Sequence, residues 1–143
     1  MTDLSKGIIE IEGIEINSDT TSTDIKTYLT NVYANCATSK SGKVDIFTFK
    51  NVILLGRRFD VDITFIREKI SDIELTTCCS ESLSYEERFK SNCDWLKSVL
   101  GEPDEIHNDG NSYYRNDKHI YSFIQRDLSR NPAETFIVCN YNR

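Results

Sequence analysis

Residues 59–65 read Phe-Asp-Val-Asp-Ile-Thr-Phe, and this stretch decides the fold class. Apolar side chains alternate strictly with Asp60, Asp62 and Thr64 along it. A period of two predicts a β-strand with one buried face and one solvated face. One strand cannot be stable alone, so neighbouring strands are expected to complete the sheet.

The segments that follow and precede this strand carry related patterns. Residues 45–55 are rich in β-branched and aromatic side chains, and residues 72–75 alternate acidic with apolar side chains. Turns at Gly56 and Arg67 separate the three segments. We therefore predict an antiparallel meander with one buried face.

A first helix is expected before the meander. Ser22 or Thr23 is expected to cap it, Asp24 lies in its first turn, and it runs to about Asn35. Its apolar stripe comprises Ile25, Leu29, Val32, Tyr33 and Cys36. Residues 39–42 are then predicted to form a loop.

A second helix is expected after the meander, with the best-marked ends in the chain. Ser84 and Glu87 have the spacing of a capping box. Gly101 is predicted to supply a left-handed C-terminal cap, and Pro103 prevents the helix from continuing.

The remaining segments are predicted to be β-structure. Residues 7–16 alternate with a phase break at Gly13, which predicts one strand or a bent pair of short strands. Strand-like patterns recur at 113–114, 119–125 and 135–141. The order is strand, helix, three strands, helix, three strands. This predicts an α+β fold of mainly antiparallel sheet with two helices in a single domain (1–143), and it allows a tandem helix-plus-three-strand repeat.

Composition limits the partners. The 143 residues carry a net charge of −6, and the longest basic run is Arg57-Arg58, which argues against nucleic acid. The longest apolar run, at residues 52–55, is far shorter than the ~20 residues that span a bilayer. No targeting signal is visible, and the five cysteines have no framework spacing. We expect a cytoplasmic protein with no membrane partner.

No catalytic motif is present. The chain lacks nucleotide-binding glycine loops, H-E-x-x-H and G-x-S-x-G, and neither His107 nor His119 lies in a known local signature. We therefore expect no catalytic residue, no metal and no cofactor, and a binding protein rather than an enzyme.

The candidate binding residues are acidic and aromatic. Carboxylates steer and anchor a basic partner, while tyrosines bury contact area at low entropic cost. The candidates are Asp60, Asp62, Asp104, Glu105, Asp109, Tyr113 and Tyr114.

Two resemblances extend this interpretation. The stretch 94–103, Asp-Trp-Leu-Lys-Ser-Val-Leu-Gly-Glu-Pro, followed by Tyr113-Tyr114 and a meander, resembles the β-lactamase-inhibitor-protein-like fold. That resemblance implies a tandem helix-plus-meander arrangement. As a small acidic α+β chain without an active-site motif, the protein also resembles bacterial toxin-immunity proteins, including those of contact-dependent growth inhibition. This second resemblance implies a tight complex with a basic, nuclease-like toxin domain.

The leading hypothesis is therefore a non-enzymatic, immunity-type inhibitor that docks its acidic face on a basic protein. Two alternatives stay open. One is a type III-like secretion chaperone, and the other is a small enzyme on a curved sheet with scattered active-site residues.

Overall fold

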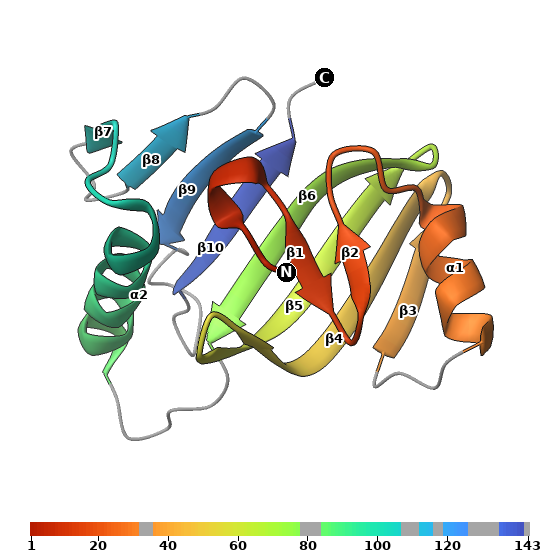
Figure 1. Ribbon diagram of the computed structural model, residues 1–143, viewed down its shortest axis with the longest axis horizontal. Helices are drawn as coiled ribbons and strands as arrows, with labels where there is room; N and C mark the ends of the chain where they lie inside the picture. Colours follow the sequence, from red (N-terminus) through yellow and green to blue (C-terminus); the bar gives the residue numbers. More distant parts are fainter. Residues whose placement is uncertain (32–35, 78–83, 107–111, 116–118, 126–134, 142–143) are drawn as a thin grey trace.

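The computed structural model describes residues 1–31, 36–77, 84–106, 112–115, 119–125 and 135–141. The two helices and the mostly antiparallel sheet confirm the predicted α+β class. The elements, labelled as in Figure 1, are η1 (Leu4–Lys6), β1 (Ile9–Ile11), β2 (Ile14–Ile16), α1 (Ser22–Asn31), β3 (Cys36–Ser41), β4 (Val44–Leu54), β5 (Arg57–Ile66), β6 (Lys69–Thr77), α2 (Tyr85–Leu100), β7 (Glu105–Ile106), β8 (Ser112–Arg115), β9 (His119–Gln125) and β10 (Thr135–Tyr141).

The main sheet has eight strands in the order β3-β4-β5-β6-β10-β9-β8-β7, and all neighbours are antiparallel. It consists of two meanders that meet where β6 pairs with β10. Each meander follows one helix along the chain. The repeat unit is therefore a helix plus four strands, rather than the helix plus three strands expected from the sequence.

The first missed strand is β3. Residues 39–42 were expected to form a loop, and Cys36 was placed on the stripe of the first helix. Instead Cys36 begins β3, which pairs with β4 as far as Ser41, and the helix α1 ends at Asn31. This strand is polar and lies at the sheet edge, so backbone pairing to β4 forms it without an alternating pattern. The second missed strand, β7, is only two residues long.

Of the element boundaries predicted from the sequence, two are confirmed and one is wrong. The break at Gly13 is a tight turn, with Glu12 and Gly13 at positive φ, so the bent pair of short strands was the correct alternative. Ser84 and Glu87 form the predicted capping box. Gly101 has φ 82° and ψ −159°, so its φ is positive but its conformation is not the left-handed helical cap that was expected.

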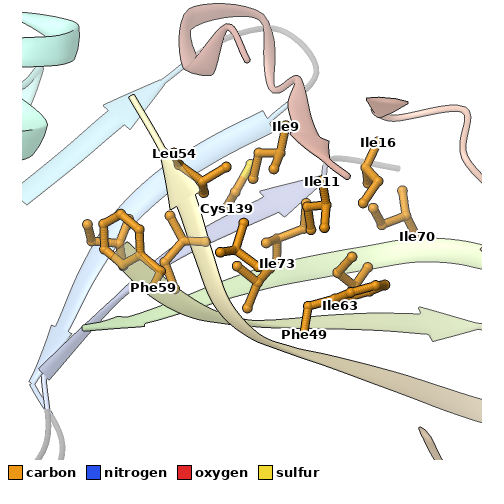
Figure 2. Close-up of a cluster of buried hydrophobic side chains, with 14 of the residues drawn as sticks. Ile9, Ile11, Ile16, Phe49, Leu54, Phe59, Ile63, Ile70, Ile73 and Cys139 are labelled. Carbon is orange, nitrogen blue, oxygen red and sulfur yellow. The ribbon is translucent and has the colours of Figure 1, made fainter. Parts of the chain in front are cut away.

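One face of the sheet is covered, and we name it the inner face. The β1–β2 hairpin lies across it between α1 and α2 (Figure 1). Figure 2 shows Ile9 and Ile11 of the hairpin pointing toward sheet residues that include Leu54, Ile73 and Cys139. Tyr141 on β10 donates a 2.8 Å hydrogen bond to the Gly7 carbonyl. The hairpin thus covers the central strands of the sheet.

Helix α2 is fixed to the inner face by aromatic and polar contacts. The Trp95 ring lies edge-on to Phe59 of β5, with the ring centroids 4.9 Å apart. Arg57 donates to the Ser91 carbonyl at 2.9 Å and to Asn92 Oδ1 at 2.8 Å, and burial lowers its pKa. These contacts hold the helix over the N-terminal end of β5. Neither helix covers the opposite face of the sheet, which we name the outer face.

The hairpin should contribute strongly to stability. Ile9 is fully buried, whereas Ile53 on β4 is 61 % exposed. We expect Ile9→Ala to lower the free energy of unfolding by about 2–5 kcal/mol, because it leaves a cavity. The matched Ile53→Ala should cost less than about 0.5 kcal/mol. Urea unfolding of both variants checks this, and equal losses would contradict the packing of the hairpin.

Candidate functional site: the acidic patch on the outer face

The acidic patch comprises Asp60, Asp62, Asp72 and Glu74, which lie on the outer face of β5 and β6. Strand alternation places them there, since the residues between them point inward and are buried. In the register of the two strands, Asp62 lies directly opposite Glu74, and Asp72 lies opposite Thr64. Antiparallel pairing therefore brings carboxylates from two strands together on one surface.

The two aspartates of β5 have different partners. Asp60 forms an ion pair with Lys50 at 3.3 Å and accepts a 3.1 Å hydrogen bond from the Asn51 amide. Asp62 accepts a 2.5 Å hydrogen bond from the Thr48 hydroxyl, and no cation pairs with it among the described residues. The negative charge of Asp60 is thus balanced by Lys50, whereas the Asp62 carboxylate is hydrogen-bonded to a neutral hydroxyl.

The pKa of Asp72 is shifted from its ordinary value. Burial raises its pKa, hydrogen bonds from Ser71 and Thr64 oppose this shift, and the charge of Asp62 adds to it. The Ser71 hydroxyl lies 3.2 Å from the Asp72 carboxylate. Like charges close to a half-buried carboxylate destabilise its ionised form.

The outer face also links the patch to the second group of predicted residues. A single row of register partners crosses the whole sheet. It runs through Ala37, Thr48, Asp62, Glu74, Val138, Ser122, Tyr113 and Glu105. At about 4.8 Å per strand, Asp62 and Tyr113 are separated by roughly 19 Å. The structure therefore places Asp60, Asp62, Tyr113 and Glu105 on one face, in two groups.

The group at β7 and β8 is partly neutralised. Glu105 forms an ion pair with Arg115, whose guanidinium lies 6.0 Å from the centre of the Tyr113 ring. The Asp104 carboxylate accepts a 2.8 Å hydrogen bond from the Arg115 amide. Unlike the patch on β5 and β6, this end of the sheet offers a mixed surface of aromatic ring, guanidinium and carboxylate.

Tyr114 and Asp109 stand apart from these groups. The Tyr114 side chain points inward, is 8 % exposed and donates a 2.9 Å hydrogen bond to the Gly101 carbonyl. Burial raises the pKa of Tyr114 to about 12. Asp109 and His107 lie outside the described residues, and of His119 only the backbone, at the start of β9, is described.

Sequence reasoning did not select Asp72, Glu74 or Thr48 as site residues. The alternation at residues 72–75 indicated that Asp72 and Glu74 shared a face of their own strand. Only the register shows that this is the face of Asp62, because a shift of one residue would have moved them to the opposite side.

Three further observations concern the kind of site. Within the described part of the chain, no three His, Cys, Asp or Glu side chains are grouped so that they could hold a metal ion. No helix in that part is long and apolar enough to cross a membrane. Comparison with known proteins found no matching family model, no matching curated protein and no matching solved structure.

The inward position of Tyr114 predicts a structural role. We expect Tyr114→Phe to lower the free energy of unfolding by about 1 kcal/mol, because the part-buried hydrogen bond to the Gly101 carbonyl is lost. Tyr28 is a matched control, since its hydroxyl also donates to a backbone carbonyl, that of Glu12 at 2.8 Å, but in an exposed position. Thermal unfolding should show little change for Tyr28→Phe. Equal effects would contradict the assignment.

Asp72 should destabilise the fold at neutral pH. Because its folded-state pKa is raised, the native state binds this proton more readily than the unfolded chain does. Stability is therefore lost as the pH rises from the ordinary value of 3.8 through the raised pKa. Asp72→Asn should increase the free energy of unfolding at pH 7, and the gain should disappear in acid.

Denaturant titrations of the Asp72→Asn variant between pH 3 and pH 7 test this directly. Asp19→Asn, at an exposed position, provides the matched control. A loss of stability at pH 7 in the Asp72 variant would show that its hydrogen bonds outweigh its burial.

Proposed function

We propose that this chain is a non-enzymatic, immunity-type inhibitor that neutralises a basic, nuclease-like toxin domain in the cytoplasm. The outer face is the docking surface, and the acidic patch is its anchor. The observation that carries the proposal is the placement of Asp62 directly opposite Glu74, with Asp72 beside them.

This arrangement works against the stability of the isolated chain. Burial and the nearby charge of Asp62 both raise the pKa of Asp72, so keeping Asp72 ionised at neutral pH lowers the stability of the fold. Hydroxyl side chains would fit at the acidic positions without charge repulsion, since the same face already carries Thr48, Thr64 and Thr76. Groups retained at a cost to stability are typical of functional surfaces.

Charge supports the same interpretation. The hairpin lies on the inner face, between the two helices (Figure 1). Nucleases bind phosphates in clefts lined by Lys and Arg, so an acidic surface is suited to filling such a cleft.

The two parts of the outer face would have different roles. Asp62 and its neighbours would steer the partner and pair with its cations, which raises the association rate. Tyr113 and Arg115, stacked at the other end of the face, are residue types that often anchor protein interfaces. Together they would provide attraction over distance and contact area on docking.

The test compares two variants that lose the same charge. Asp62→Asn with Asp72→Asn alters the acidic patch, whereas Asp19→Asn with Asp94→Asn alters exposed positions away from it. Each tagged protein is used to capture partners from the native cell lysate at low and moderate salt, followed by mass spectrometry. The captured protein is then purified for binding kinetics.

We expect a basic protein that the patch variant no longer retains and the control variant does. In kinetics, the patch variant should associate about tenfold more slowly at low salt, with a flatter salt dependence. Identical rates for the two variants would contradict the proposal. Capture of an unfolded effector by a dimer of this chain would instead support the secretion-chaperone alternative.

A further inference from the structure

A hollow of about 370 Å³ lies at one end of the sheet, where two turns meet. Lys43 belongs to the β3–β4 turn and Arg67 to the β5–β6 turn, and the Arg67 amide donates a 2.9 Å hydrogen bond to the Lys43 carbonyl. The lining residues are Lys40, Gly42, Lys43, Asp45, Arg67 and Glu68. We name this site the turn hollow.

The carboxylates of the turn hollow are already engaged. Asp45 is buried and lies 3.5 Å from Lys40 and 3.7 Å from Lys26. Glu68 accepts hydrogen bonds from the amide and hydroxyl of Thr23, at 3.2 and 2.6 Å, which lower its pKa. Glu68 is therefore committed to the first turn of α1.

The cationic side chains of the turn hollow differ from its carboxylates in their partners. Among the described residues, neither Lys43 nor Arg67 forms an ion pair. Both side chains line the hollow beside Lys40. In a protein whose net charge is −6, this end of the sheet concentrates positive charge that the chain itself does not neutralise.

The backbone of the β5–β6 turn is left-handed. Arg67 and Glu68 have φ angles of 51° and 72°. Glu12 and Leu55 adopt the same region in two other hairpin turns, so the conformation belongs to the turn geometry. Asn and Gly are the residues that adopt it at least cost.

We propose that the turn hollow binds a phosphoryl dianion, either as inorganic phosphate or as a small phosphate monoester. The planar guanidinium of Arg67 can donate to two phosphoryl oxygens, and Lys43 can neutralise the remaining charge. The volume lies at the lower end of the range for small-molecule sites. Lys40 and Asp45, which are register partners, place the hollow toward α1, so this site is separate from the acidic patch.

The experiment is a titration of the ¹⁵N-labelled protein with sodium phosphate, followed by amide chemical shifts. Sodium chloride at equal ionic strength is the reference. We expect saturable shifts confined to residues 41–44 and 66–69. A parallel titration with glycerol 3-phosphate separates the two sources, since tighter binding than that of phosphate indicates a monoester and weaker binding indicates the free ion.

Two variants and one control make the test specific. Arg67→Asn and Lys43→Gln should each weaken phosphate binding about tenfold, because each removes a charge-assisted contact. Lys90→Gln on α2 removes the same charge at a distant, exposed site and should change nothing. Because Asn tolerates the left-handed turn, Arg67→Asn should melt at or above the temperature of the parent, so lost binding cannot reflect unfolding.

Several results would overturn the proposal. Shifts no larger than those given by chloride would remove the site. Unchanged phosphate binding by Arg67→Asn, or an equal loss in Lys90→Gln, would show that any binding is a diffuse charge effect. None of these results would bear on the acidic patch, whose test uses other residues and another ligand.

Discussion

The antiparallel pairing of β6 with β10 is the interaction on which the rest of the structure depends. It places Ile73 opposite Cys139 and Leu75 opposite Ile137, so two meanders far apart in the chain share one inner face. That face is then wide enough to receive the β1–β2 hairpin, which is fastened to β10 by the bond from Tyr141 to Gly7. Without this pairing the hairpin would lose the β10 side of the apolar surface that it covers.

The same pairing creates the outer face as one surface. The register row from Asp62 to Tyr113 passes from β6 to β10 through Glu74 and Val138, and Val138 is only 6 % exposed, so a buried residue separates the acidic patch from Tyr113. The inner face is an apolar core whose packing stabilises the molecule. The outer face carries the half-buried carboxylate of Asp72, and the packing of this core must offset the cost of ionising it. This division of roles explains how a small domain tolerates the acidic patch.

Net charge alone conceals the distribution of charge in this protein. The value of −6 suggests a uniformly acidic surface. In the structure, the acidic patch lies on the outer face, and the cations of the turn hollow collect at one end of the sheet. The β7–β8 end is partly neutralised by the pairing of Arg115 with Glu105. Since screening in physiological salt acts within about 8 Å, these regions present distinct local fields to approaching molecules.

The sequence by itself determined the elements whose signals are local. Strict alternation at 59–65 defined β5, and the capping box from Ser84 to Glu87 defined the start of α2. The tertiary structure alone decided what depends on pairing between distant segments: the polar edge strand β3, the union of β6 with β10, and the meeting of Asp62 with Glu74 and Asp72. The physical reason is that alternation fixes which residues of one strand share a face, whereas the register between strands fixes which strands share it. Register arises from hydrogen bonds and packing across the whole sheet, and no local pattern encodes them.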